Sequence, residues 1–473
     1  MEIDDFIKKI ENNEIDIVEH TKNVINDIEK INEEYNFFNT IAKDDAIKQA
    51  KELKLQDKKN KKLLGVSVSI KDAICAKGIL TRAGSKILTN YIPQFDSTVV
   101  KRIKDEGGII IGTTAQDEFG FGGFSVNVGK DFNVPLNPID RERSCGGSSG
   151  GAAGITKKAE FSHIALGEST GGSVASPGSF CGIFALCPTY GRISRYGLID
   201  YGNSLDKIGI MSKKPKDIAL MLKIISGYDD MDSTSSREKV DDYSSYLDKD
   251  IKGMKIGIIS ECFENINDEV KENCLNAIEK LKERGAICRE VSLPFTLKYG
   301  LSAYYLISTS EASTNLAKYC GLRYGMQEKL EGNFNEYFTK VRSNNFGDEV
   351  KRRIILGTFT RMSGFRDAYY IKAAKVRTLI IEEYKKQFND FDLLVSPVVP
   401  YTSPKFEDIK KMKPIEHYMA DIMLVGPNIS GLPHMSMNVG YDKNKMPIGL
   451  LGIANHFDEG KLIQLSKEFI ENE

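Results

Sequence analysis

The sequence predicts one large α/β unit, and three observations carry that prediction. A strand over Met254–Ser260, a helix over Asp268–Arg284 and a strand over Ala286–Val291 follow one another. This alternation implies two parallel strands joined by a right-handed crossover. The central stretch Arg143–Arg195 holds two glycine- and serine-rich loops around an apolar run. The 473 residues suffice for a large core. Length alone suggests about three domains, but the glycine-rich centre favours a single unit.

The N-terminal part of the chain reads as helices followed by a strand. Residues 1–52 are charged, with apolar side chains at helical spacing, which predicts two or three helices. Residues 53–62 are expected to form a loop. Leu63–Ile70 alternates in part and is rich in β-branched residues, so we expect a strand that delivers Lys71 at its end. Toward the centre, the same criteria predict a helix over Val99–Glu106 closed by Gly107-Gly108, a strand over Ile109–Ile111, a glycine-rich loop over Phe119–Gly129, and strands over Phe161–Leu166 and Ile183–Leu186.

The C-terminal part reads as a second alternation of helices and strands. Asp229–Asp250 is polar and charged, which favours a surface connection. The remaining expected elements are a helix over Pro215–Tyr228, mostly helical structure over 300–390, strands over Leu393–Ser396 (stopped by Pro397) and Ile448–Ile453, and a helix over Glu459–Ile470.

Composition excludes several classes of protein. Lys and Arg number 65 against 66 Asp and Glu, a net charge of −1, so nothing marks the whole chain as an electrostatic nucleic-acid binder. Eight cysteines occur without a C-x-x-C pair, which excludes the common zinc and redox spacings and fits a reducing cytosol. The polar N-terminus lacks the apolar core of a signal peptide, and no apolar run reaches membrane-spanning length. We therefore expect a cytoplasmic protein without membrane contact and without a metal site.

The two glycine-rich loops are the candidate functional segment. They cover Gly146–Gly151 and Gly167–Ser173. Glycine lets a backbone approach a ligand closely, and a serine beside such a backbone can have amide N–H groups aimed at its reaction centre, as acyl transfer requires. Two such loops around a strand, with a lysine at a neighbouring strand end, favour a catalytic site over plain turns.

Three other interpretations of these loops compete. Ser148 and Ser169 each sit in G-x-S-x-G, the nucleophile-elbow pattern, and His417, His434 or His456 lies downstream as a possible base. A phosphate cradle is a second interpretation, but the chain lacks G-x-x-x-x-G-K-[ST] and a fitting G-x-G-x-x-G. In the third, the glycines form tight turns and the serines cap helices.

Several segments together resemble the amidase signature family. They are SIKDAI at 69–74, GGSSGG at 146–151, TGGS at 170–173 and FCGIFALCPTYGR at 180–192. Three more resemble the branch that forms the glutaminase subunit of a three-subunit tRNA-dependent amidotransferase: SRYGLIDYGNSLDKIG at 194–209, EASTNLAKYCGLRYG at 311–325 and EVKRRIILGTFTRMSGFRDAYYIKAAKVR at 349–377. The resemblance extends over nearly the whole chain. It implies the amidase signature fold, a twisted mixed sheet of about eleven strands surrounded by helices, with an N-terminal helical segment (1–62) packed on the amidase signature domain (63–473) as one structural unit.

The resemblance also implies a Ser–Ser–Lys mechanism. Ser173 is the expected nucleophile on the side-chain amide of glutamine, and Ser148 the relay that passes its proton to Lys71. Lys71 must then be a neutral amine, whereas a free lysine has a pKa of about 10.4. Burial disfavours the ammonium and so supports this role. On the residues alone, an ion pair between Lys71 and its neighbour Asp72 is the competing interpretation. The family also has a cis peptide before the relay serine, here Gly147–Ser148.

The remaining site residues come from the same resemblance. The backbone N–H groups of Thr170, Gly171 and Gly172, with that of Ser173, are the expected oxyanion hole. Further along, the resemblance places Arg353 on the substrate α-carboxylate, Asp421 on its α-ammonium and Tyr304 nearby. Considered singly, Arg353 reads as a helix-surface charge and Asp421 as a cap.

Three positions depart from the usual family pattern. Ser169 stands where Asp is common, Ala175 where Arg is common and Cys187 where Lys is common. None belongs to the Ser–Ser–Lys set, but the contacts that hold the Gly167–Ser173 loop must differ. The G-E-S-T variant resembles archaeal members of the branch.

The resemblance implies a division of labour within a complex. This chain is expected to bind no cofactor and to release ammonia from glutamine. A partner B subunit is expected to use ATP and Mg²⁺ and to make most tRNA contacts, and a small C subunit to clamp the two together. Two alternatives remain open: a free-standing amidase of the same family that acts on another small amide, and a non-catalytic scaffold.

Overall fold

A mixed sheet runs through the whole molecule. The computed structural model describes residues 2–56 and 60–470. Its eleven strands lie in the order β1-β3-β2-β4-β6-β5-β10-β11-β9-β7-β8. They are β1 (Phe38–Ile41), β2 (Ser67–Lys71), β3 (Ile109–Thr114), β4 (His163–Ser169), β5 (Phe184–Cys187), β6 (Lys207–Ser212), β7 (Lys255–Ile259), β8 (Ile287–Val291), β9 (Leu393–Pro397), β10 (His434–Tyr441) and β11 (Pro447–Ala454).

Parallel pairs lie toward both ends of this sheet, and antiparallel pairs occupy its middle. Strands β3, β2 and β4 are parallel neighbours, as are β9, β7 and β8. The strands between them, from β4 to β9, pair antiparallel, and β1 closes the first edge antiparallel to β3. The predicted twisted, mixed α/β sheet is confirmed, and so is the parallel pairing of β7 with β8 across a helix.

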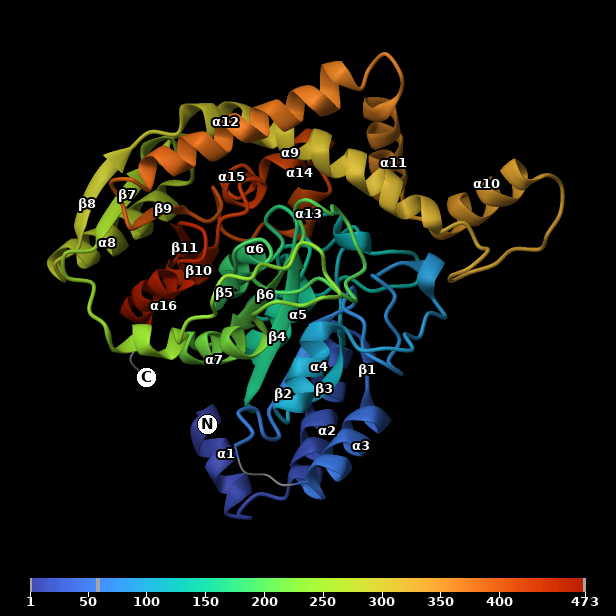
Figure 1. Ribbon diagram of the computed structural model, residues 1–473, viewed down its shortest axis with the longest axis horizontal. Coiled ribbons are helices and arrows are strands. Elements are labelled where there is room, and N and C mark those ends of the chain that lie inside the picture. The colour runs from blue at the N-terminus through green and yellow to red at the C-terminus, as the bar shows by residue number, and fades with distance from the viewer. Residues whose placement is uncertain (1, 57–59, 471–473) are drawn as a thin grey trace.

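Helices cover the sheet on both sides and extend beyond it at one end. In Figure 1, α9, α11 and α12 form a long helical arm at the top, and α1–α3 lie at the opposite end. The helices are α1 (Ile3–Glu11), α2 (Ile17–Tyr35), α3 (Lys43–Lys54), α4 (Thr98–Asp105), α5 (Gly150–Lys158), α6 (Ala175–Cys181), α7 (Pro215–Ile225), α8 (Asp268–Glu283), α9 (Pro294–Asn315), α10 (Phe334–Asn345), α11 (Asp348–Arg361), α12 (Lys372–Gln387), α13 (Phe406–Ile409), α14 (Pro414–Met419), α15 (Val425–Ile429) and α16 (Glu459–Ser466).

Local signals set several of these boundaries. The Asp16 carboxylate caps α2 by accepting from two backbone N–H groups, and Ser97 caps α4 through its Oγ. After α4 the chain turns through Gly107 at φ +84°, a left-handed conformation that glycine adopts without strain. The helices expected within residues 1–52 are confirmed as three, α1 to α3.

The structure corrects the sequence analysis at several places. Strands β1, β6 and β10 were not predicted, and neither were α5 and α6. Every residue of β6 is buried, so no polar alternation marks it. The expected strands Leu63–Ile70 and Phe161–Leu166 lie further along the chain, as β2 and β4, which therefore include Lys71 and Ser169.

Smaller corrections concern element ends. Pro397, which was expected to stop the strand after Ser396, is instead the last residue of β9 and pairs with Leu450. The helix expected up to Ile470 ends at Ser466 and continues as a 3-10 turn. The Asp229–Asp250 connection contains a 3-10 turn whose Tyr243 is fully buried, so it is not purely a surface loop. Within the expected loop 53–62, α3 continues to Lys54, and residues 57–59 lie outside the described part of the chain.

The N-terminal segment shares the core of the sheet. Side chains of α1, α2 and α3 belong to the same apolar cluster as those of β2, β3 and β4. Strand β1, which lies between α2 and α3, extends the sheet itself through its pairs with β3. The domain boundary placed after residue 62 stays a prediction.

Helix α5 depends on a glycine for its packing. A Cβ added at Gly154 would lie 2.1 Å from Cε1 of the buried Phe37 ring. In α9, by contrast, a Cβ at Gly300 would meet no heavy atom closer than 3.7 Å. There is no room for a methyl group at Gly154, whereas there is room for one at Gly300.

We therefore expect opposite effects from the same substitution. Gly300→Ala should raise the free energy of unfolding by up to about 1 kcal/mol, because alanine favours a helix. Gly154→Ala should lower it by about 1–3 kcal/mol, because the overpacked ring must move. Urea unfolding followed by circular dichroism measures both. Equal stability of the two variants would contradict this packing of α5.

Candidate active site

Lys71 lies at the end of β2, fully buried. All five residues of this strand are buried, and the exposed fraction of Lys71 is 0%. Its Nζ lies 2.6 Å from Ser148 Oγ, 2.8 Å from Glu168 Oε2 and 3.0 Å from the backbone oxygen of Glu168. The structure therefore brings together the expected base and the expected relay serine.

Ser148 stands in the loop that leads into α5. The Gly147–Ser148 peptide is cis, as the resemblance implied. Asp117 lies under this loop, since a Cβ at Gly147 would fall 2.3 Å from its Oδ2, and its carboxylate accepts from the N–H groups of Ser125 and Asn127. Burial raises the pKa of Asp117 to about 6. The loop is thus supported by a buried, hydrogen-bonded carboxyl group.

Ser173 lies in the second glycine-rich loop, between β4 and α6, and is nearly buried. Its backbone oxygen accepts from Ser149 N–H at 3.2 Å, which ties the two loops together. Among the described residues, the N–H groups of 170–173 donate to no backbone or side-chain acceptor. Consecutive N–H groups without an acceptor are what an oxyanion hole needs.

The sequence analysis missed Glu168 and Asp206. Glu168 is 3% exposed and forms the ion pair with Lys71. The hydroxyl of Thr170 lies 2.7 Å from Glu168 Oε1 and 2.7 Å from Asp206 Oδ1, and Asp206 accepts from the N–H groups of Tyr201 and Gly202. The available signal was a glutamate close after the apolar run Phe161–Leu166, because glutamate is rarely buried unless it is paired.

The ion pair between Lys71 and Asp72, the competing interpretation of this lysine, is absent from the described structure. Asp72 does not pair with Lys71. Its carboxylate accepts from Asn39 Nδ2 and from the backbone N–H groups of Arg82 and Gly84.

The nucleophile-elbow interpretation is wrong because, in the described part of the chain, no histidine lies beside either serine as a general base. Ser148 Oγ contacts a lysine, and the buried Ser169 interacts with the side chain of Cys187. His434 contacts Leu432 O and Asn428, and His456 contacts Ser430 O. His417 lies in the wall of a cavity described below. None of the three pairs with either serine.

Arg353 is a buried residue and not the helix-surface charge that its sequence context favours. It is 3% exposed on α11. Its Nε donates to Glu349 Oε1 at 2.8 Å and its Nη1 to Tyr201 Oη at 2.6 Å. Rings of Phe121, Tyr201, Tyr305 and Tyr418 lie within 5.8 Å of its guanidinium carbon. A buried guanidinium has five N–H donors, so this one keeps others for a ligand.

Asp421 and Tyr304 lie against the Ser173 loop. A Cβ at Gly172 would lie 2.6 Å from Asp421 Oδ1, and one at Gly171 would lie 2.7 Å from Tyr304 Oη. Only glycine permits both approaches. Burial raises the pKa of Asp421 to about 7, although the nearby Arg353 opposes this shift. Burial likewise raises the pKa of the Tyr304 phenol well above its ordinary value, so it stays a neutral donor.

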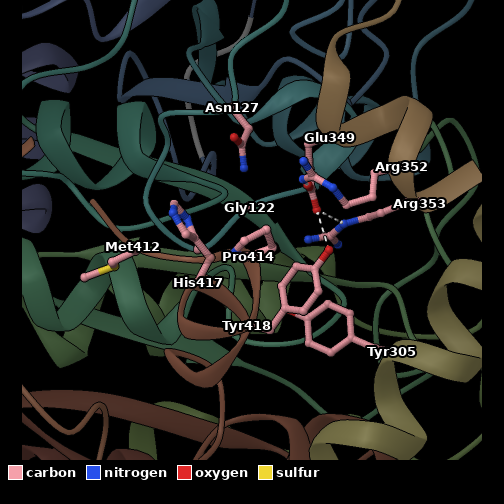
Figure 2. A pocket seen from close by; sticks show the side chains of 11 residues that line it. Gly122, Asn127, Tyr305, Glu349, Arg352, Arg353, Met412, Pro414, His417 and Tyr418 are labelled. Carbon is pink, nitrogen blue, oxygen red and sulfur yellow. Dashed lines mark hydrogen bonds and ion pairs between the residues drawn. The ribbon is translucent and has the colours of Figure 1, made fainter. Parts of the chain in front are cut away.

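A cavity of about 230 Å³ opens beside Arg353. Figure 2 shows Arg353, Glu349 and the stacked rings of Tyr305 and Tyr418 on one side, with His417 and Met412 across from them. Gly123 belongs to the same wall, and a Cβ there would lie 3.9 Å from Asp421 Oδ1. Asp421 therefore lies behind this wall, between Gly123 and Gly172, the glycine before Ser173.

The three departures from the family pattern are buried in this region. The side chains of Ser169 and Cys187 interact with each other, Cys187 also lies beside Asn428, and Ala175 begins α6. The described residues contain no cluster of three or more His, Cys, Asp or Glu side chains suited to a metal ion. Within the same residues, no helix combines the length and apolarity that a membrane crossing needs.

Comparison with known proteins agrees with this geometry. The sequence profile of the family described as Amidase matches residues 19–463. The A subunit of glutamyl-tRNA(Gln) amidotransferase from Halothermothrix orenii is 45% identical over 92% of this chain and 90% of its own length. The A subunit from Carboxydothermus hydrogenoformans is 42% identical over 98% and 96%.

A solved structure gives the same result in three dimensions. The crystal structure of the glutamyl-tRNA(Gln) amidotransferase A subunit from Thermotoga maritima superposes with a TM-score of 0.79 at 33% identity, covering 96% of this chain and 92% of that one. The chain therefore belongs to the amidase family and, within it, to the family of glutamyl-tRNA(Gln) amidotransferase A subunits.

Proposed function

We propose that this chain is the glutaminase subunit of glutamyl-tRNA(Gln) amidotransferase, a carbon–nitrogen ligase that takes its nitrogen from glutamine. It hydrolyses glutamine to glutamate and ammonia, and the complex uses the ammonia to convert Glu-tRNA(Gln) to Gln-tRNA(Gln). The observation that supports this proposal most directly is the contact of 2.6 Å between Lys71 Nζ and Ser148 Oγ. It lies beside the second buried loop, which contains Ser173.

Proton transfer follows this contact. Ser173 Oγ attacks the side-chain amide carbon of glutamine while its proton passes to Ser148, and the proton of Ser148 passes to Lys71. The same path returns a proton to the leaving nitrogen, so ammonia departs and an acyl-enzyme remains. Water then repeats the sequence and releases glutamate. The free N–H groups of Thr170, Gly171 and Gly172 stabilise the oxyanion in both halves.

The charged end of glutamine fits the cavity beside these loops. Arg353 can donate to the α-carboxylate with the N–H groups that Glu349 and Tyr201 leave unused. Asp421 lies where it would accept from the α-ammonium, and Tyr304 donates beside the Ser173 loop. A small neutral amide requires neither charge, so this pair favours glutamine over the alternative of a free-standing amidase. The intact Lys71–Ser148 contact disfavours a non-catalytic scaffold.

The partners and the compartment belong to the same proposal. The relatives are named as A subunits, which supports assembly with B and C subunits. We assign ATP, Mg²⁺ and most tRNA contacts to the B subunit, since this chain carries a net charge of only −1. No cofactor is required for the serine chemistry of this chain. All eight cysteines are free, which supports a cytoplasmic location.

An exposed apolar patch on the helical arm supports contact with the B subunit. We define the arm patch as Ile355, Leu356, Phe359, Met362 and Phe365, all exposed, at the end of α11 and just beyond it. Ile355 is 67% exposed. Apolar side chains gathered on one face are typical of a protein interface.

The nucleophile is tested by ammonia release from glutamine by the purified complex. Ser173→Ala should lower kcat by at least about 10³-fold, because no other hydroxyl forms the acyl-enzyme. Ser169→Ala, the matched control in the same loop, should stay within about tenfold of wild type. Wild-type turnover by Ser173→Ala would refute the assignment, and a collapse of Ser169→Ala would revive the nucleophile elbow.

The substrate ammonium site makes KM depend on pH. Asp421 binds the ammonium only as a carboxylate, and its pKa is raised to about 7. Binding is therefore complete at higher pH and weakens as the pH falls through about 7, so the KM for glutamine should rise there. Asp421→Asn should raise KM at every pH and remove this rise. Asp217→Asn, which removes a buried carboxyl remote from the site, should keep the wild-type KM profile, and a similar loss there would contradict the assignment.

The arm patch predicts a selective loss of assembly. Ile355→Glu should weaken, by at least about tenfold, the copurification of the B subunit, because a charge is buried against an apolar partner surface. Leu55→Glu, at a more exposed site (89%) directly after α3, the helix at the opposite end of the molecule in Figure 1, should not. Size-exclusion chromatography of the coexpressed complex measures both, and unchanged assembly of Ile355→Glu would exclude the patch.

A further inference from the structure

The hydroxyl of Thr170 lies between two carboxyl groups. Its Oγ1 is 2.7 Å from Glu168 Oε1 and 2.7 Å from Asp206 Oδ1. A hydroxyl has one proton to donate, and an ionised carboxylate can only accept. Two ionised carboxylates would therefore leave one of these two short contacts without a hydrogen. The geometry requires one of the carboxyl groups to carry a proton.

This protonated pair contacts the expected base directly. The other oxygen of Glu168, Oε2, lies 2.8 Å from Lys71 Nζ. All of these side chains are buried, and Lys71 is fully so. We propose that Glu168 and Asp206 share one proton across Thr170 and that its position sets the charge facing Lys71, which makes both carboxyl groups positioning residues for the base. The inference rests on the proposed role of Lys71.

Two arrangements of the proton are possible. In the first, Asp206 donates to Thr170 Oγ1 and Thr170 donates to Glu168, so the ionised Glu168 holds Lys71 as an ammonium. In the second, the Asp206 proton has moved to Thr170 and the Thr170 proton to Glu168 Oε1. One O–H bond breaks and one forms at each step, and no proton enters from solvent. Lys71 then faces an uncharged acid, which favours the neutral amine that the serine relay needs.

Both end states are accommodated by the surroundings. In the second arrangement the ionised Asp206 is stabilised by hydrogen bonds that the N–H groups of Tyr201, at 2.9 Å, and Gly202, at 3.0 Å, donate to it. Burial, followed by the charge of Glu168, raises the pKa of Asp206 well above its ordinary value, in line with the first arrangement in the ligand-free protein. Tyr201 also accepts from Arg353 through its hydroxyl, so the pair borders the proposed carboxylate site.

Other charged groups near Lys71 do not replace this pair. Asp117 lies under the Ser148 loop and is occupied by two backbone N–H groups. Asp72 points to Asn39 and Arg82. Among the described residues, Glu168 is the carboxyl group in contact with the Lys71 ammonium. A change of charge at Glu168 should therefore act first on Lys71.

The test is the dependence of kcat on pH at saturating glutamine in the purified complex, because this profile reports groups in the substrate complex. Glu168→Gln removes the counter-charge of Lys71 and should move the acidic limb to lower pH. In Asp206→Asn the amide oxygen accepts from the N–H groups of Tyr201 and Gly202, which turns the amide N–H toward Thr170. Thr170 then donates to Glu168 and fixes it as a carboxylate, so the limb should move to higher pH. We expect each shift to be about one pH unit, as for a close charge partner. Asp217→Asn should leave the limb in place.

Opposite shifts distinguish this role from simple support of the fold, which would scale kcat at every pH. Unmoved limbs, or two shifts in one direction, would overturn the inference while leaving the proposed function intact. Loss of the proposed function itself would show separately, as wild-type activity of Ser173→Ala.

A second measurement needs no activity. At a pH of about 8.5, well above the raised pKa of about 7 that burial gives Glu118 and Asp421, those groups are ionised. The infrared difference spectrum between wild type and Asp206→Asn should then show the C=O stretch of one protonated carboxylic acid in the wild type. Absence of that band in a folded pair of proteins would also overturn the inference.

Discussion

The buried amine of Lys71 constrains the positions of the groups around it. An ammonium removed from water is costly unless acceptors surround it. Here three acceptors do so: a serine hydroxyl, a carboxylate and a backbone oxygen. Because Nζ needs all three at hydrogen-bond distance, the ends of β2 and β4 and the loop before α5 must hold their relative positions. The two carboxyl groups behind Thr170 extend the same constraint to β6, whose first residue follows Asp206.

The sheet supplies that rigidity. Strands β2 and β4 are parallel neighbours, so Lys71 and Glu168 leave the same edge of the sheet side by side. Helix α5 begins at the relay loop and packs its glycine face against Phe37, which precedes β1. The Ser173 loop closes over this edge and is joined to the relay loop through Ser149. Catalytic groups on strand ends and helix starts are held more precisely than groups on free loops.

The residues proposed to bind the charged end of the substrate come from a separate part of the chain. Arg353 comes from α11 in the helical arm, and Asp421 follows α14, yet both reach the glycines before Ser173 or the cavity beside them. Glu349 offsets the charge of Arg353, whose guanidinium also faces the Tyr305 ring, and Asp421 accepts from the Tyr305 hydroxyl at 3.3 Å. Arg353 and most of the arm patch lie on the same helix, α11. The proposed substrate contact and the proposed partner contact therefore share that helix.

Sequence alone determined the α/β class, the parallel β7–β8 unit and, through resemblance, the candidate residues Lys71, Ser148, Ser173, Arg353 and Asp421, because repeating apolar patterns and glycine-rich motifs are local. Strand β6 escaped detection because all of its residues are buried, whereas the alternating polar and apolar residues of β10 were a signal that the sequence analysis missed. The partner of Lys71 was also beyond sequence: Asp72 adjoins it in the chain, but successive side chains on a strand point to opposite faces. Only the register of β2 against β4 decided that Glu168, 97 residues away, meets the amine instead.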